Sequence, residues 1–159
     1  MDLQTEQEVW RRVKGPGGMR AEDAVLPERL EALILEQRAD SAALQALSRQ
    51  MRGQGSTVLS RMAQRTKRRA QKLTTLHFLL TGRRLRVRNP AKLPAAGPLP
   101  EALREAWLRN KQAARAYDAL REEFSDYAEE FADYASEVKS DGRTLSGILA
   151  QQMREAAPK

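Results

Sequence analysis

The sequence predicts an all-α protein: a four-helix bundle of two helical hairpins joined by a long crossover, with a short helix in front. Apolar residues recur at spacings of three and four along four long segments, which is the pattern of helices with one buried face. Stretches rich in glycine and proline separate these segments, and no strand-like alternation of useful length occurs.

Composition narrows the class of protein. A chain of 159 residues is long enough for one domain with its own core. The absence of cysteine excludes disulfides and thiolate metal sites, and it suits a cytoplasmic protein. No run approaches the roughly 18 apolar residues of a membrane span, and the polar N-terminus lacks the apolar core of a signal peptide. We therefore expect a cytoplasmic protein that does not enter a membrane.

The N-terminal region, residues 1–20, is expected to hold a short amphipathic helix from Leu3 to Val13 and then a glycine-rich linker. The first bundle helix should begin near Pro27, because proline suits the first turn of a helix. Glycines at positions 53 and 55 should end it.

The second helix should start behind Ser56 or Thr57 as the N-cap and stop at Gly82. Residues 83–99 then contain three prolines and cannot be helical. About 17 extended residues span roughly 50 Å, whereas the second helix is about 38 Å long. This crossover can therefore run the full length of the bundle and start the third helix at its far end.

The second hairpin is expected to begin at Pro100 and Glu101. We place its turn near residues 122–125, because one helix from Glu101 to Ser140 would be about 60 Å long and half of it would lack a partner. A second possible break is Asp141-Gly142. The bundle would then occupy residues 27–152, followed by a tail at 153–159.

Each of the four helices carries polar residues where the buried face should be apolar, and these positions lie at matching depths. Such a layer is either a binding site or the remains of one. With Val138, which stands one turn before Asp141, the layer consists of Gln37, Thr66, Arg69, Asn110, Val138 and Asp141.

The two predicted hairpins share one design. The second helix reads Thr66-x-x-Arg69-x-x-x-Leu73-x-x-Leu76, and the fourth reads Val138-x-x-Asp141-x-x-x-Leu145-x-x-Ile148. The first and third helices share a second pattern, in which apolar residues follow the polar one at +7 and +10: Gln37 with Leu44 and Leu47, and Asn110 with Tyr117 and Leu120.

This design resembles the ferritin-like superfamily, and within it the rubrerythrin type, over about residues 27–152. The resemblance implies a di-iron site made by one Glu on each of the first and third helices and a Glu-x-x-His on each of the other two. The two single-Glu positions hold Gln37 and Asn110. The Glu-x-x-His positions hold Thr66 with Arg69, and Val138 with Asp141.

These residues do not make an iron site. Amides are neutral, valine cannot ligate, and arginine is a permanent cation, whereas iron needs carboxylates and imidazoles. A shifted frame would bring in Glu36, or Glu137 with Ser140, which supplies two carboxylates and no imidazole. We therefore expect no cofactor and no oxidase, peroxidase or ferroxidase activity, while a residual iron-binding protein is the alternative.

An arginine at an inward position must be paired, because an unpaired buried charge is very costly. In the topology that the resemblance implies, the second and fourth helices are neighbours. We therefore predict a salt bridge between Arg69 and Asp141, with hydrogen bonds from Gln37 and Asn110 around it. The alternative is that one or more of these side chains extend to solvent at the edge of the bundle.

Charge is strongly segregated within a net charge of +7. Residues 41–100 contain 13 Lys/Arg and no Asp or Glu, and residues 122–141 contain eight acids against one base. We favour the interpretation that basic and acidic helices face each other in one bundle. The alternative is a nucleic-acid surface, made of Arg61, Arg65, Lys67, Arg68, Lys72, Arg83, Arg84, Arg86 and Arg88.

The sequence thus favours a non-enzymatic structural or interaction protein, which would pair with a second copy or with another protein. Nucleic-acid binding is the second hypothesis.

Overall fold

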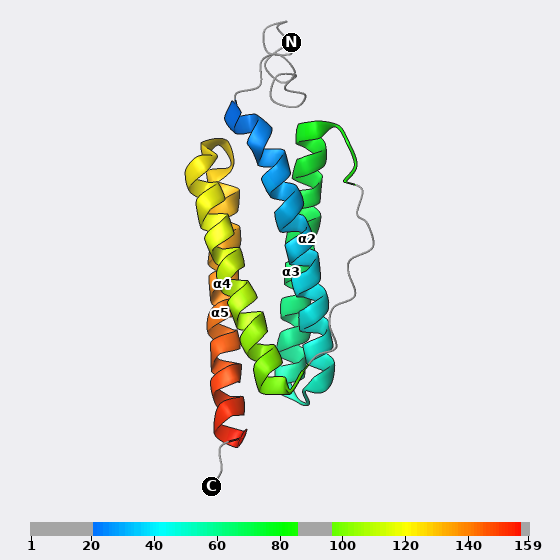
Figure 1. Cartoon of the computed structure of the whole chain (residues 1–159), viewed down its shortest axis with the longest axis vertical. Helices are drawn as coiled ribbons and strands as arrows, with labels where there is room; N and C mark the ends of the chain where they lie inside the picture. Colours follow the sequence, from blue (N-terminus) through cyan, green and yellow to red (C-terminus); the bar gives the residue numbers. More distant parts are fainter. Residues whose placement is uncertain (1–20, 86–96, 157–159) are drawn as a thin grey trace, which may run out of the picture.

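The computed structural model describes residues 21–85 and 97–156, and over these residues it is helical with no strand (Figure 1). Its elements are α2 (Ala21–Gln50), α3 (Gln54–Thr81), α4 (Leu99–Glu123), the short 3-10 helix η1 (Ser125–Tyr127) and α5 (Ala128–Ala156). The predicted helix at Leu3 to Val13, most of the crossover and the last three residues lie outside the described ranges. Among the described residues, none of the helices combines the length and the apolar character of a membrane span.

The helices pack as two antiparallel hairpins, α2 with α3 and α4 with α5. The hairpins meet through α2 against α4 and, more sparsely, through α3 against α5. The end of α3 and the start of α4 lie at opposite ends of the bundle, as the predicted crossover requires (Figure 1). The predicted all-α four-helix bundle is therefore confirmed.

The start of the first helix was predicted wrongly. α2 begins at Ala21 and continues through Pro27. Proline removes one backbone hydrogen bond of the helix but does not prevent a turn in front of it. Leu26 lies in that turn and is only 1% exposed, so burial in the core holds it in place.

The N-cap of α3 was also predicted wrongly, whereas its end was predicted correctly. Gly53 is the N-cap residue, with φ of 72°, and the Ser56 hydroxyl donates instead to the Ser48 carbonyl at 2.6 Å. At the other end Gly82 has φ of 68°, and its N–H donates to the Phe78 carbonyl. A left-handed glycine that closes the last turn is a common helix stop.

The second hairpin turns where the sequence predicted it, since α4 ends at Glu123 and Phe124 follows as its buried cap residue. The second possible break, at Asp141-Gly142, is wrong, because α5 continues to Ala156. Leu145 is buried beyond this point, so packing of the following turns holds the helix together.

Apolar side chains of the described residues form two core clusters, and a polar layer divides them. The cluster nearer the α4–α5 turn includes Leu30, Leu73 and Phe131, and the other includes Leu47 and Leu59. In every helix the polar residue of the predicted layer falls between the two clusters along the chain. The layer is therefore a section across the middle of the core.

Candidate functional site

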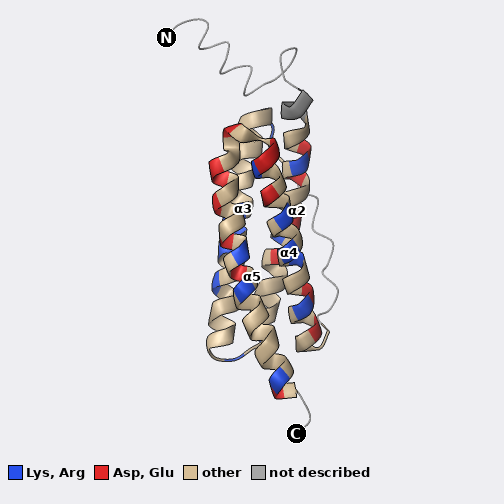
Figure 2. Ribbon diagram, turned by 90° about the vertical axis from the view of Figure 1, so that its left-hand side faces the viewer, with Lys and Arg blue, Asp and Glu red and all other residues tan. Residues whose placement is uncertain are grey.

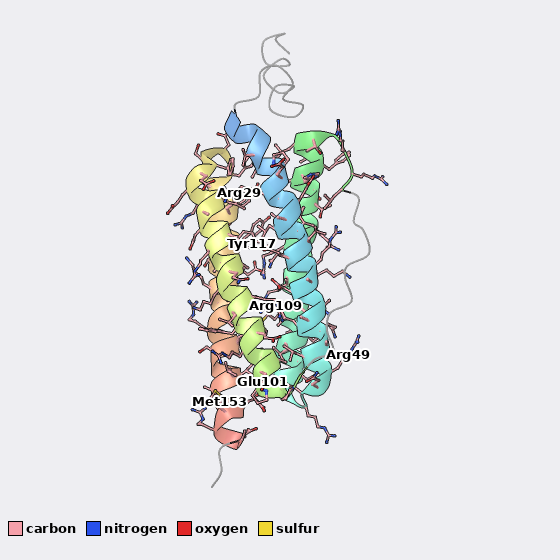
Figure 3. All side chains as sticks on the ribbon, viewed as in Figure 1. Arg29, Arg49, Glu101, Arg109, Tyr117 and Met153 are labelled. Carbon is pink, nitrogen blue, oxygen red and sulfur yellow. The ribbon has the colours of Figure 1, made fainter. Side chains whose placement is uncertain are left out.

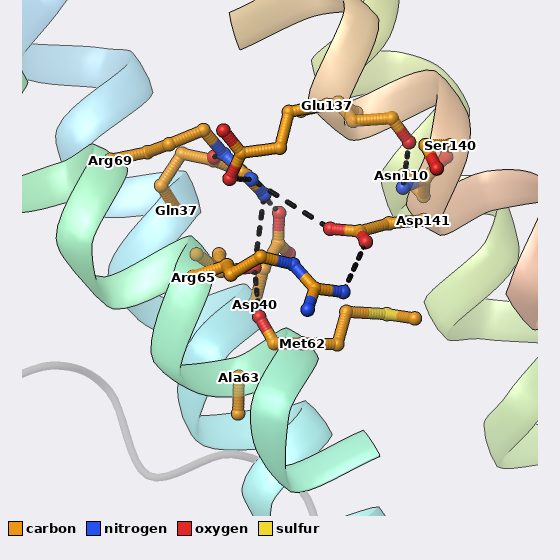
Figure 4. Close-up of polar contacts among 12 residues, drawn as sticks. Gln37, Asp40, Met62, Ala63, Arg65, Arg69, Asn110, Glu137, Ser140 and Asp141 are labelled. Carbon is orange, nitrogen blue, oxygen red and sulfur yellow. Dashed lines mark hydrogen bonds and ion pairs between the residues drawn. The ribbon is translucent and has the colours of Figure 1, made fainter. Parts of the chain in front are cut away.

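The residues of the predicted polar layer meet around one small cavity of about 20 Å³ in the middle of the bundle. All six contribute to its lining, namely Gln37, Thr66, Arg69, Asn110, Val138 and Asp141. Asp40 and Arg109 line it as well, and Figure 4 shows most of this group. The volume accommodates one water molecule.

The Arg69 guanidinium is the centre of the layer, and its side chain is 4% exposed. Nη1 lies 2.7 Å from Oε1 of Glu137 and 3.7 Å from Oδ2 of Asp141. Nε donates to Oε1 of Gln37 at 3.2 Å, and Nη2 donates to Oγ1 of Thr66 at 3.0 Å. The predicted ion pair with Asp141 is thus present, but Glu137 is the nearer carboxylate (Figure 4).

Asp141 is buried between two arginines of α3. Its Oδ1 accepts a hydrogen bond from Nη2 of Arg65 at 2.6 Å, whereas its Oδ2 has no hydrogen-bond partner among the described residues. Burial raises the pKa of Asp141, and the neighbouring Arg65 and Arg69 oppose that rise. Two cations are therefore arranged around one buried carboxylate.

Gln37 links the Arg69 contacts to the second hairpin. Its Oε1 also accepts a hydrogen bond from the Tyr117 hydroxyl at 3.0 Å, and its Nε2 donates to Oδ2 of Asp40 at 3.1 Å. The other oxygen of Asp40 lies 3.3 Å from Nε of Arg109. Figure 3 shows Arg109 and Tyr117 on α4, which faces α2.

Burial raises the pKa of Asp40 to about 6, although Arg109 and the Gln37 amide favour its charged form. Burial also raises the pKa of the Tyr117 hydroxyl, which therefore keeps its proton and acts as a donor.

Asn110 does not join the hydrogen bonds around Arg69, which corrects the prediction. Its Nδ2 donates to the Val138 carbonyl at 2.9 Å, across the contact between α4 and α5. Its Oδ1 lies against Gly142, where an added Cβ would come within 2.4 Å of it. The missing side chain at Gly142 brings the Val138 carbonyl within reach, and this satisfies the amide locally.

The sequence pattern did not assign three further residues to the layer, namely Asp40, Arg65 and Arg109. Each is one turn from, or adjacent to, a predicted layer residue, since Asp40 follows Gln37 by three and Arg65 precedes Arg69 by four. A search for charged residues within one turn of each predicted layer residue would have included them.

The donor set does not fit a di-iron centre. Glu36 is exposed, and Glu137 is engaged by the Arg69 guanidinium. The exposed Ser140 contributes no charge. No group of three His, Cys, Asp or Glu side chains in the described ranges could hold a metal ion.

The predicted basic residues divide into two groups. Arg65 is half-buried and paired with Asp141, so α3 and α5 neutralise each other in part, as expected. The exposed ones are Arg61, Lys67, Arg68, Lys72, Arg83 and Arg84, while Arg86 and Arg88 lie outside the described residues. Most of the acids lie away from these exposed cations. Asp and Glu gather toward the end of the bundle where α4 passes into α5 (Figure 2).

Comparisons of the chain with protein-family models, with curated proteins and with solved structures find no match.

Proposed function

We propose that this chain is a non-catalytic bundle of the ferritin-like, rubrerythrin-type design in which an arginine has replaced the di-iron centre, and that it acts as a structural or interaction protein. The observation that carries the proposal is the position of Arg69. Its guanidinium lies in the layer between the two core clusters and contacts Glu137 and Asp141 from the facing helix.

Charge balance supports this interpretation. In a di-iron bundle the metal ions provide the positive charge that the inward carboxylates require. Here Arg69 and Arg65 provide that charge to Glu137 and Asp141. A guanidinium has no lone pair for a metal and does not lose its proton, so it occupies the position without any possibility of ligation.

The layer also lacks the features of a catalytic site. Its cavity of about 20 Å³ holds a water molecule but no organic substrate, since ligand pockets measure roughly 300–1,000 Å³. Every arginine in it is held by a carboxylate, and the Tyr117 hydroxyl is held by Gln37. Such an arrangement fixes the register of four helices, which is the role we assign to it.

Elemental analysis tests the proposal. Protein purified without a metal-affinity tag is incubated anaerobically with excess ferrous iron, desalted and analysed for iron. We expect less than about 0.1 iron per chain, because the donors are occupied by arginines. A value near two per chain would overturn the proposal and would favour a residual iron-binding protein that uses Glu36 and Glu137.

The matched control is the double variant Thr66→Glu/Arg69→His, which rebuilds one Glu-x-x-His and removes the central cation. The glutamate that it introduces makes three carboxylates together with Glu137 and Asp141, and the introduced histidine adds one imidazole. We expect it to retain more iron than the wild type under the same conditions.

A further inference from the structure

The outward side of α3 is a basic face without any acid. It consists of Arg61, Lys67, Arg68 and Lys72, to which α2 adds Arg38. The other exposed positions between Arg61 and Lys72 are two glutamines, and α3 contains no Asp or Glu. We refer to these five cations as the basic face.

A groove of about 480 Å³ runs beside this face, between α2 and α3. Arg38 and Lys67 stand in its wall, and no acidic residue lines it. The remaining lining consists of small or amide side chains, namely Ser41, Ala42, Gln45, Ala63 and Gln64. The small residues leave the groove open, and the amides offer neutral hydrogen-bond donors beside the two cations.

The positive charge of this face is not compensated within the described residues. Arg61, Lys67 and Arg68 form no ion pair there, whereas Arg65 in the same stretch is paired with Asp141. Arg68 and Lys72 stand four residues apart on α3, and like charges at this spacing repel each other. An external anion would relieve this repulsion.

We propose that the basic face and its groove bind the phosphodiester backbone of a nucleic acid. Arginine, lysine and glutamine side chains are among the groups that contact phosphates, and the outward side of α3 presents all three. The inference rests on the proposed function, because it names a nucleic acid as the partner of the proposed interaction protein.

The exposed residues favour nucleic acid over a membrane or an acidic protein. A membrane-binding helix carries apolar residues among its cations, and a protein interface needs buried apolar or aromatic anchors. Every exposed side chain from Arg61 to Lys72 is polar. The exposed pair Phe78 and Leu79 lies more than one turn beyond Lys72, and the exposed Leu35 lies one turn before Arg38 on α2. The four cations of α3 are therefore presented without an apolar side chain among them, which suits backbone contacts that carry no sequence information.

The test is fluorescence anisotropy of a fluorescein-labelled 20-base-pair DNA duplex, titrated with the full chain at several salt concentrations. The wild type is compared with R61Q/K67Q/R68Q and with the control R104Q/R115Q/R143Q. The control removes the same charge from exposed positions of α4 and α5 that form no ion pair among the described residues.

We expect the wild type to bind with a Kd of roughly 1–100 µM, which is the range of non-specific binding. Since each phosphate contact contributes about 0.9 to the slope of log K against log salt, the basic-face variant should lose about 2 to 3 from that slope and at least tenfold in affinity at low salt. The control should keep the wild-type slope. Circular dichroism at 222 nm verifies that both variants remain helical.

Three results would overturn the inference. The first is no binding by the wild type at 50 mM salt. The second is an equal loss in both triple variants, which would mean diffuse attraction by net charge. The third is a wild type that does not bind DNA but binds phosphatidylserine vesicles, or associates with itself in sedimentation equilibrium, in a way that the R61Q/K67Q/R68Q substitutions abolish. Iron near two per chain would refute the proposed function alone and leave the salt slope unchanged, so the two failures are distinguishable.

Discussion

Arg69 carries a permanent charge into the centre of the core, so its contacts decide the energetics of the polar layer. Its side chain is 4% exposed, as is that of Asp141, while the Glu137 side chain is 39% exposed. Glu137 can therefore regain water if Arg69 is lost, but Asp141 cannot. The removal of Arg69 leaves Asp141 with only the half-exposed Arg65.

We predict that Arg69→Leu lowers the free energy of unfolding by about 3–5 kcal/mol, because breaking a buried pair strands a desolvated charge. The control Arg68→Leu removes an exposed arginine without an ion pair in the described structure and should change stability by at most about 0.5 kcal/mol. Urea unfolding followed by circular dichroism measures both.

The double variant R69L/D141L separates the ion pair from simple packing. It should be more stable than R69L, since no stranded carboxylate remains in the core. If R69L costs no more than R68L, or if D141L adds its full separate cost to that of R69L, the two residues are not coupled.

Asp40 should make stability depend on pH. Burial raises its pKa from about 3.8 to about 6. Between pH 4 and 6 the folded chain therefore keeps a proton that the unfolded chain has lost, so a rise in pH through this window favours unfolding. The difference in pKa corresponds to about 3 kcal/mol of folding stability, which is lost as the pH rises from about 4 through the folded pKa near 6.

The measurement is urea unfolding of the wild type and of Asp40→Asn at half-unit steps from pH 4 to 7. Relative to the variant, the wild type should lose stability as the pH rises from 4 through 6, and the loss should level off by about pH 7. Asp141 also has a raised pKa, but it is present in both proteins and cancels from the comparison. Parallel curves would contradict the assignment.

At the scale of the helix, the contact between α4 and α5 depends on a missing side chain. Gly142 is buried against Asn110, and a Cβ there would lie 2.4 Å from Oδ1 of that residue. Gly147 lies on the same helix, and nothing stands within 4 Å of its Cβ position. The two glycines therefore differ in surroundings but share one helix.

We predict that Gly147→Ala raises the free energy of unfolding by about 0.5–1 kcal/mol, since alanine is the better helix former. The free energy of unfolding of Gly142→Ala should be at least about 1 kcal/mol lower than that of Gly147→Ala, because Asn110 must move and lose its hydrogen bond to the Val138 carbonyl. Thermal and urea unfolding test the pair. Equal gains at the two positions would show that Asn110 is free to move.

The helix boundaries show which local signals the sequence carries. Gly82 stopped α3 as predicted, because a left-handed position favours glycine whatever surrounds it. The start of α2 could not be predicted in this way, because the burial of Leu26 overrides the preference of Pro27 for a first turn. Ser56 was misassigned because its hydroxyl bonds to the preceding helix, a contact that only the folded hairpin creates.

At the scale of the whole molecule, spacing predicted which residues share the layer but not which atoms bind each other. Gln37, Thr66, Arg69 and Asp141 meet as expected, since matching depths in four helices define one plane of the bundle. The preference of Arg69 for Glu137 depends on helix rotation, and so does the engagement of Asp141 by Arg65. A periodic pattern fixes such rotation only to within part of a turn.

Cations also connect the two hairpins beyond the layer. Arg29 of α2 pairs with Glu123 of α4, and Lys72 of α3 lies 5.9 Å from the centre of the Tyr134 ring of α5. Together with Arg69 and Arg109 these contacts run from the end of the bundle at the α4–α5 turn to the polar layer in its middle. Charged side chains therefore link the two hairpins both within the polar layer and between that layer and the α4–α5 turn.

The most direct test of the proposal that Arg69 stands in place of iron is crystallographic. Crystals of the wild type are soaked anaerobically in ferrous iron, and anomalous difference maps are collected at the iron edge. We predict no peak in the layer and a guanidinium of Arg69 in hydrogen-bond contact with Glu137. An anomalous peak between Glu137 and Asp141, with Arg69 turned away to solvent, would contradict it.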